Sequence, residues 1–365
     1  MTTVPGRGDP VATAGGVSLP AGECGAEDQV SRPGPSEPMV GLPAGPVHLA
    51  LVGATATGKT SLAVALARRR GDLELVSADA IAVYRGLDVG AAKPTPSERA
   101  GLAWHLLDLV EPGEEFSVAA FQQAARAALA AIEGRGHRAV LVGGSGLYHR
   151  AVVDELALPG RYPETAAALE TEAAEPGGPE RLHRRLAELD PLAAARIEPG
   201  NARRTVRALE VVLGSGRAFS EHGPGLEHYG ASRFLQVGLR VPRGELAGRI
   251  VARLDAQLAS GFIDEVRAWR DAGAVSRTAA RALGYAELTA VLDGSVSLEE
   301  ARQRLVGRTR SFARRQEAWF RRDPRVHWLD ADGDDRLGAL EALLAACRFP
   351  PPPVGTQASG DDVGG

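Results

Sequence analysis

The segment from Gly53 to Thr60 constrains the fold of this chain more than any other. It fits the pattern Gly-x-x-x-x-Gly-Lys-Ser/Thr, after a predicted strand (47–52) and at the start of a predicted helix (59–70). In that context backbone N–H groups approach phosphate oxygens, and the helix N-terminus adds a fixed positive dipole. Lysine supplies a compact charge and the final threonine a hydroxyl for Mg²⁺. We predict a diphosphate-binding loop consisting of Gly53, Ala54, Thr55, Ala56, Thr57, Gly58, Lys59 and Thr60.

Lysine usage gives a second, independent indication. Only Lys59 and Lys93 are lysines, although Lys and Arg together number 42. A guanidinium is planar and forked whereas an ammonium is a point charge, so a lysine retained at position 59 fits a site shaped for a compact cation. For Lys93 the sequence leaves two interpretations open, a second functional lysine or an ordinary surface lysine.

Around the loop the pattern is α/β. Short apolar runs at 47–52, 73–76, 106–109 and 139–142 predict buried parallel strands. The run 234–241 alternates as a returning strand does, and helical patterns cover 117–133, 243–272, 279–292 and 297–322. Between 156 and 230 the strand signal fades and helices at 180–189 and 202–213 remain. We predict an α/β fold, a P-loop NTPase-like parallel sheet flanked by helices, with a helical insertion. The predicted organisation is a catalytic core (46–155 and 231–348), the insertion (156–230) and disordered tails (1–45 and 349–365).

Composition narrows the class of protein. The chain of 365 residues is 44% hydrophobic and 24% charged, which allows a large core and an added domain. Its formal charge of −4 gives no indication of a nucleic-acid partner. The two cysteines, Cys24 and Cys347, support neither a disulfide framework nor a zinc finger. No apolar stretch reaches the roughly 18 residues of a membrane span, and no export signal is present. We therefore expect a soluble protein of the reducing cytoplasm, with no membrane association and no implied protein partner.

A phosphate loop by itself is compatible with kinases, ATPases and GTPases. The guanine-reading pattern Asn-Lys-x-Asp is missing, because Gly58 and Ala92 precede the two lysines. Asp108 follows an apolar run and is a candidate Walker-B aspartate. The next strand, however, ends in Gly143-Gly144 rather than in a carboxylate. The sequence therefore offers little support for a metal-triphosphate apparatus.

A second long segment makes the assignment more specific. Residues 77–94, Ser-Ala-Asp-Ala-Ile-Ala-Val-Tyr-Arg-Gly-Leu-Asp-Val-Gly-Ala-Ala-Lys-Pro, resemble a signature of bacterial tRNA dimethylallyltransferases, whose first signature is the phosphate loop. Further segments resemble the same family in the same order, so that the resemblance covers roughly residues 46–330. These segments are 105–109, 116–118, 142–148, 190–196, 203–210, 260–262, 283–285 and 314–319.

The resemblance implies a reaction and an acceptor. The exocyclic N6 amine of the adenosine 3′ of the anticodon, at tRNA position 37, attacks the allylic carbon of dimethylallyl diphosphate, and diphosphate leaves with the help of Mg²⁺ held by Thr60. Thr55 and Arg253 are implied to face the diphosphate. Asp79 follows a predicted strand, where open parallel sheets place their sites, and is our candidate general base. The resemblance implies tRNA contacts by Asp79, Ala80, Ile81, Ala82, Ser145, Arg203, Arg204, Thr205, Val206, Arg207, Arg281, Gly284 and Tyr285.

Some positions depart from the family pattern. Ala80, Ala82 and Ala91 stand where serine, glutamine and threonine are common, so a contact at these positions would lack the hydroxyl or amide group of those side chains. Ala166 occupies a position where some relatives have an arginine that contacts tRNA, although Arg161 is nearby. The zinc finger of eukaryotic relatives is absent from the sequence.

Two arginine clusters are candidates for RNA binding. Residues 302–325 carry nine arginines against Glu317 and Asp323, a local balance of +7, with Arg304, Arg308, Arg315 and Arg322 on one helical stripe and Leu305, Phe312 and Trp319 on another. Arg203, Arg204 and Arg207 form the second cluster. We expect the insertion and the core to grip the anticodon arm, with the target base extruded from its stack.

Three alternatives stay open at this stage. The first is a small-molecule kinase, and the second is a prenyltransferase that acts on free adenine nucleotides. The third is a non-catalytic RNA-binding protein, which intact Lys59, Thr60 and Asp79 disfavour.

Overall fold

The computed structural model describes residues 48–350 except 224, 274 and 332–334. The predicted tail at 1–45 lies outside the described residues, as does all of the predicted tail at 349–365 beyond Pro350. Phe349 is buried in the hydrophobic core. The hydrophobic core therefore includes a residue beyond position 348.

The described core contains one parallel sheet of six strands in the order β3-β2-β4-β1-β5-β6. Strand β1 is central, with β2 and β4 on one side and β5 and β6 on the other. Ligands of such sheets bind at the carboxyl ends of the strands, beside the point where the strand order reverses. The predicted α/β fold is confirmed. The strands are β1 (His48–Gly53), β2 (Leu73–Ser77), β3 (Trp104–His105), β4 (Arg138–Val142), β5 (Phe234–Arg240) and β6 (Val326–Asp330).

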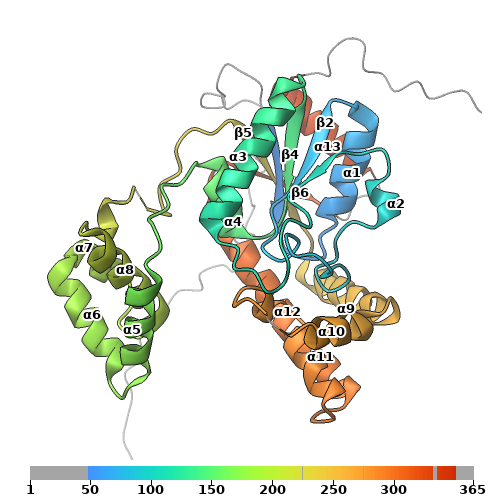
Figure 1. Cartoon of the computed structure of the whole chain (residues 1–365). Helices are drawn as coiled ribbons and strands as arrows, with labels where there is room; N and C mark the ends of the chain where they lie inside the picture. Colours follow the sequence, from blue (N-terminus) through green and yellow to red (C-terminus); the bar gives the residue numbers. More distant parts are fainter. Residues whose placement is uncertain (1–47, 224, 274, 332–334, 351–365) are drawn as a thin grey trace, which may run out of the picture. The chain divides into compact units, whose positions relative to one another are not determined.

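The strands are apolar on both faces because helices cover both. In β1, Ala50 and Val52 belong to one hydrophobic core, and Leu49 and Leu51 belong to the other. Helices α3 (Val118–Gly134) and α4 (Gly146–Val153) contribute to the first core. Helices α1 (Lys59–Arg70) and α13 (Arg336–Ala346) contribute to the second. Figure 1 shows α3 and α1 on opposite sides of the sheet.

Four helices in the region predicted as an insertion share a hydrophobic core of their own, which includes Leu169, Leu182, Leu186 and Leu209. Asp190 caps α7 through its side chain, and Asn201 caps α8. The helices predicted at 180–189 and 202–213 are confirmed by α6 and α8. The elements are α5 (Pro163–Ala174), α6 (Gly178–Leu189), α7 (Pro191–Arg196), α8 (Ala202–Ser215) and the short η1 (Phe219–Glu221).

After β5 the chain is helical until β6. A capping box of Ser297 and Glu300 starts the long helix α12 (Leu298–Arg321). The elements in the remaining loops are α2 (Pro96–Arg99), α9 (Arg243–Ala259), α10 (Phe262–Asp271), η2 (Ala279–Arg281) and α11 (Tyr285–Leu292). Within the described ranges, no helix has both the length and the apolar character that crossing a bilayer requires.

Several predicted elements need correction. The strand predicted at 106–109 is wrong, because Leu106 and Asp108 have φ values of +63° and +56°, in the left-handed region. The helix predicted at 243–272 is two helices, separated at Gly261 with φ +91°. The helix predicted at 279–292 is likewise interrupted at Gly284, with φ +95°. Strand β6 and helix α13 were not predicted from the sequence pattern.

Candidate active site

Two glycines give the loop after β1 its shape. Gly53 has φ +137°, and a Cβ on it would lie 2.5 Å from the carbonyl oxygen of Leu239 on β5. Gly58 has φ +86° and is the N-cap residue of α1. An L side chain at either position is strained, and at Gly53 it also collides with backbone. The loop therefore leads directly from the central strand into a helix N-terminus, as an anion site requires.

Lys59 is buried within this loop. Its Nζ atom donates a hydrogen bond of 2.5 Å to the carbonyl oxygen of Ala54, which also accepts a bond of 2.9 Å from the hydroxyl of Thr57. Burial, followed by the positive charge of Arg253, lowers the pKa of Lys59 to about 7, while Asp79 acts in the opposite direction. A buried ammonium that lacks a full counter-charge is the group that a bound diphosphate stabilises.

A cavity at the carboxyl ends of β1, β2 and β4 brings together residues from distant parts of the chain. It encloses about 620 Å³, part of it open solvent, and its walls include Lys59, Thr60, Asp79 and Arg253. Thr55 lines it as well, so the three predicted catalytic residues share one cavity. This arrangement places cations and a carboxylate around the same space.

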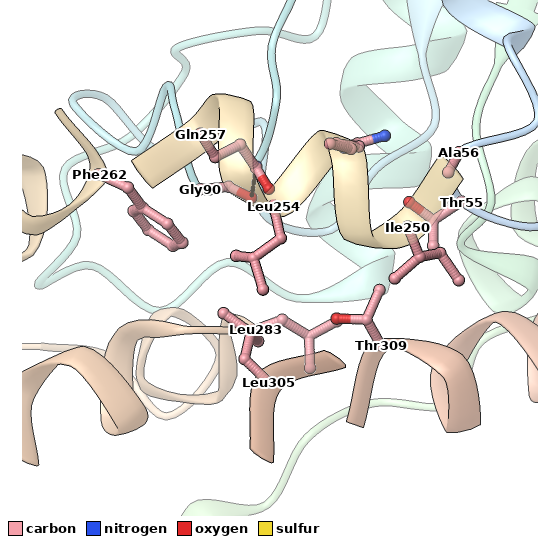
Figure 2. A pocket seen from close by; sticks show the side chains of 11 residues that line it. Thr55, Ala56, Gly90, Ile250, Leu254, Gln257, Phe262, Leu283, Leu305 and Thr309 are labelled. Atoms are coloured by element: carbon pink, nitrogen blue, oxygen red, sulfur yellow. Dashed lines mark hydrogen bonds between the residues drawn. The ribbon is translucent and has the colours of Figure 1, made fainter. Parts of the chain in front are cut away.

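A second cavity adjoins the first, since Thr55 and Arg253 belong to the walls of both. Its space of about 420 Å³, part of it open solvent, has more apolar side chains in its walls, among them Ile250, Leu254 and Leu305. Figure 2 shows Leu254 on α9 facing Leu305 and Thr309 on α12 across this space. The phosphate-binding loop therefore borders a polar and an apolar compartment.

Asp79 uses one carboxylate oxygen for the backbone. Its Oδ1 atom accepts hydrogen bonds from the N–H groups of Ile81 (2.8 Å) and Ala82 (3.3 Å). Within the described part of the chain, Oδ2 has no hydrogen-bond partner. The turn fixes the orientation of the carboxylate, and its second oxygen stays available at the cavity. The backbone-capping role and a role as base are therefore compatible.

Residues 80–82, which follow Asp79, have small or partly buried side chains and so offer little side-chain surface for a contact with tRNA. Ala82 is buried and Ile81 is half-buried, and the N–H of Ala80 donates a 3.3 Å hydrogen bond to the hydroxyl of Ser145. Ser145, predicted from a different motif, is thus adjacent to the segment that begins at Asp79.

Gln316 on α12 lies in the segment 314–319 and links two loops of the site. Its Oε1 atom accepts a 2.8 Å hydrogen bond from the N–H of Thr55, and its Nε2 atom donates one of 2.9 Å to the carbonyl oxygen of Gly144. A Cβ on Gly146 would lie 2.3 Å from the indole nitrogen of Trp319. Helix α12 therefore closes tightly over the loop after β4 and links it to the loop after β1.

Lys93 is not a surface lysine. Its side chain is buried, and Nζ donates to the carbonyl oxygen of Tyr84 (2.5 Å) and to carboxylate oxygens of Asp88 (2.7 Å) and Asp108 (2.5 Å). Burial raises the pKa of Asp108, but hydrogen bonds from Lys93 and Arg99 outweigh that effect, so the pKa is lowered overall. Asp108 is therefore the partner of a structural lysine, which accounts for it without a Walker-B role.

Glu265 on α10 binds the backbone of residues 88–90, in the segment that also contains Lys93. Its carboxylate accepts hydrogen bonds from three consecutive N–H groups, those of Asp88 (2.7 Å), Val89 (2.6 Å) and Gly90 (2.9 Å). The hydroxyl of Tyr285 donates a fourth, of 2.6 Å. Nothing in the sequence pattern around Glu265 indicated this role, because its three backbone partners lie 175 to 177 residues away along the chain.

Tyr285 requires a correction, since its side chain is fully buried and cannot contact RNA directly. Burial, with Glu265 next, raises its pKa. Its role is to hold Glu265 in place. Gly284 is also buried, and a Cβ there would lie 2.6 Å from the ring of Phe262. Of the predicted contacts in this segment, only Arg281 is exposed.

In the cluster on α8, two arginine side chains have no partner in the described part of the chain, and the third is hydrogen-bonded within the fold. Arg203 and Arg204 are exposed and have no side-chain partner within the described ranges. Arg207 instead donates to the carbonyl oxygens of Pro159 (2.8 Å) and Gly160 (3.0 Å) and forms an ion pair with a buried glutamate, Glu210. The predicted contacts at Thr205 and Val206 also need correction, because both side chains are buried and face away from solvent.

The arginine stripe of α12 is divided in the same way. All four arginines are exposed, but Arg308 forms an ion pair with Glu287, and within the described residues the other three form none. On the opposite stripe Leu305 is buried as predicted, and Phe312 and Trp319 are half-buried.

Known proteins resemble this chain over most of its length. The sequence profile of the family described as IPP transferase matches residues 82–323. The tRNA dimethylallyltransferase of Kineococcus radiotolerans is 50% identical over 303 residues, which are 81% of this chain and 95% of that protein. The protein of the same name from Streptomyces coelicolor is 48% identical over 313 residues, 86% of this chain and 99% of its own length.

Solved structures agree with the sequence comparison. The tRNA isopentenylpyrophosphate transferase of Bacillus halodurans superposes with a TM-score of 0.60 at 37% identity, over 82% of this chain and 95% of that one. A eukaryotic dimethylallyltransferase acting on tRNA gives a TM-score of 0.69 over 84% of this chain and 81% of its own, and at 21% identity it shows the fold alone. By profile, identity and coverage, this chain belongs to the IPP transferase family.

Proposed function

We propose that this protein transfers a dimethylallyl group from dimethylallyl diphosphate to the N6 amine of the adenosine 3′ of the anticodon, at position 37 of tRNA. The observation that carries the proposal is the shared cavity of Lys59, Asp79 and Arg253 in a chain of this family. The names of the relatives support alkyl transfer to tRNA over phosphoryl transfer to a small molecule.

The leaving group is stabilised at the phosphate-binding loop. As the allylic C–O bond breaks, negative charge builds on the diphosphate, which faces Lys59, Arg253 and the N-terminus of α1. A well-placed donor in a partly dry site contributes about 3 kcal/mol to transition-state stabilisation. Thr55 completes this wall, with its N–H held by Gln316.

Mg²⁺ fits the donor set at this position. Within the described part of the chain, no group of three or more His, Cys, Asp and Glu side chains could form a metal cage. Mg²⁺ commonly binds through one or two protein oxygens, substrate phosphates and retained waters. Thr60 lines the cavity and would hold the ion there, where it would neutralise charge on the diphosphate.

Asp79 acts at the attacking end. The N6 nitrogen of the adenine forms a bond to the allylic carbon and loses a proton, which the free Oδ2 oxygen of Asp79 is available to accept. Such general-base assistance contributes roughly 10² to 10⁴ in rate. The adenine must leave its stack to reach the cavity, as bases do in other base-modifying enzymes.

Exposed arginines hold the anticodon arm of the tRNA acceptor. Arg203 and Arg204 on α8 and Arg304, Arg315 and Arg322 on α12 are exposed. Arginines bind phosphate oxygens through paired N–H groups. A tRNA acceptor also points to the cytoplasm as the compartment in which the protein works.

Replacing Asp79 with asparagine is expected to lower kcat by at least about 100-fold and to change tRNA affinity only a few-fold. The asparagine oxygen can still accept from the N–H groups of Ile81 and Ala82, so the turn should persist. Single-turnover prenyl transfer and tRNA titration measure the two quantities. Asp264→Asn, at an exposed acidic residue on α10, is the matched control and should behave as wild type. A parallel collapse of tRNA binding in Asp79→Asn would show that Asp79 is structural.

Replacing Arg203 and Arg204 together with glutamine is expected to weaken tRNA binding and to flatten its salt dependence. Each lost contact with a single-strand phosphate should reduce the slope of log K against log salt by about 0.7. Arg207 is left intact because its hydrogen bonds to Pro159 and Gly160 belong to the fold. Arg184→Gln, an exposed arginine on α6, is the control. An unchanged slope in the double variant would mean that these arginines form only a solvated face.

A further inference from the structure

A further arginine reaches the phosphate-binding loop from the C-terminal helix. Arg336 is the first residue of α13, and its Nη1 atom lies 3.0 Å from the position that a Cβ on Gly58 would occupy. Gly58 is the N-cap residue of α1. The guanidinium therefore lies against the end of the helix at which an anion binds to backbone N–H groups.

The topology explains how this contact arises. Both α1 and α13 follow parallel strands, β1 and β6, so their N-termini lie at the same edge of the sheet. An ion pair of 3.1 Å between Arg69 and Glu341 joins the two helices. Leu340 of α13 belongs to the same buried core as Leu66 of α1. Arg336 is thus carried by a packed helix rather than by a free loop.

The charge environment of Arg336 favours an anionic ligand. The N-terminus of α1 has a positive dipole, and Lys59, the residue after Gly58, is a buried cation, so a further cation is unfavourable there unless an anion binds. Within the described ranges Arg336 has no hydrogen-bond or ion-pair partner. Its neighbour Asp335 instead accepts a hydrogen bond from the N–H of Gly338 and caps α13.

We propose that Arg336 is a diphosphate-binding residue that contacts the leaving group from the flank of the loop opposite Asp79. Asp79 follows β2 and Arg336 follows β6, on opposite sides of the central strand β1. A guanidinium can donate two parallel N–H bonds to phosphate oxygens. Arg336 lies outside the matched family segment of 82–323. The inference rests on the proposed function, because diphosphate is a product of that reaction.

Binding of inorganic diphosphate with Mg²⁺ to the full chain, measured by calorimetry, tests this assignment without the prenyl donor or tRNA. Arg336→Gln is expected to raise the Kd about 10-fold or more, because a charge-assisted hydrogen bond to the diphosphate is lost. Arg336→Lys should recover part of the affinity, and thermal melting verifies that each variant is folded. In turnover assays the inhibition constant of diphosphate should rise in parallel, while the KM for tRNA stays unchanged.

Arg69→Gln is the matched control, because it removes one positive charge and the ion pair between α1 and α13 but leaves the loop untouched. Its diphosphate affinity should stay within about two-fold of wild type. Wild-type affinity in Arg336→Gln overturns the proposal, and so does an equal loss in Arg69→Gln, which would show that only helix docking matters. Lys59→Ala separates a failure of the Arg336 assignment from a failure of the proposed function. If it also binds diphosphate normally, the loop is not the diphosphate site and the proposed function fails as well.

Discussion

Lys59→Arg is expected to be nearly as inactive as Lys59→Ala, with kcat lowered about 10³-fold in both, at the upper end of the effect of removing one transition-state donor. The ammonium of Lys59 is buried, and its Nζ atom lies 2.5 Å from the carbonyl oxygen of Ala54. A guanidinium is longer and planar, so it cannot occupy this space without displacing the loop that positions the diphosphate. Prenyl transfer to an anticodon stem-loop at saturating substrates is the measurement.

The reverse exchange at an exposed site provides the control. Arg68 is exposed on the same helix and donates to the carbonyl oxygen of Ser97, and Arg68→Lys should keep nearly full activity. If Lys59→Arg retains more than half of the wild-type rate, the loop tolerates a forked cation and the argument from the shape of the ammonium is wrong.

AMP is expected to be a poorer acceptor than an anticodon stem-loop by more than about 10³ in kcat/KM. Binding energy from a whole anticodon arm holds the adenine near the allylic carbon, and effective molarities from such positioning reach many orders of magnitude. A detached nucleotide forfeits the contacts of Arg203 and Arg204 on α8 and of the exposed arginines on α12. Dimethylallyl diphosphate and Mg²⁺ are supplied with either acceptor, and the prenylated product is quantified.

A stem-loop with guanosine at the target position is the matched control and should give no product. Comparable rates on AMP and on the adenosine stem-loop would refute the tRNA assignment and leave prenyl transfer standing. An absence of product with both acceptors would reopen the kinase interpretation, which a test for ATP-dependent phosphoryl transfer would then address.

The loop and the central sheet could be predicted because they depend on local chemistry. Glycine at 53 and 58 permits backbone conformations that other residues avoid, and the apolar runs of β1, β2, β4 and β5 are long enough to identify as strands. The run at 106–109 misled the prediction. Leu106 is apolar because it packs in the core from a left-handed turn, and composition alone does not distinguish such a turn from a short strand.

Helix ends and edge elements were harder to predict. Gly261 and Gly284 each interrupt a continuous amphipathic pattern with a positive φ, although glycine within a helical pattern is often tolerated. Strand β6 lies at the edge of the sheet and is only partly buried, so its sequence lacks the apolar run that marked the inner strands.

By itself, the sequence determined the phosphate-binding loop, the parallel α/β class and, through colinear motifs, the family and the residues expected at the site. Only the tertiary structure decided which arginines are free, since Arg203 and Arg207 belong to one sequence cluster and differ only in the partners that the fold gives them. It also decided which side chains hold the site together. Gln316 meets Thr55 across 261 residues of chain, and Glu265 meets the segment after Asp79 across more than 170. No local pattern encodes such contacts, because a carboxylate or an amide acquires its role from whichever backbone groups the packing of distant helices brings within hydrogen-bond reach.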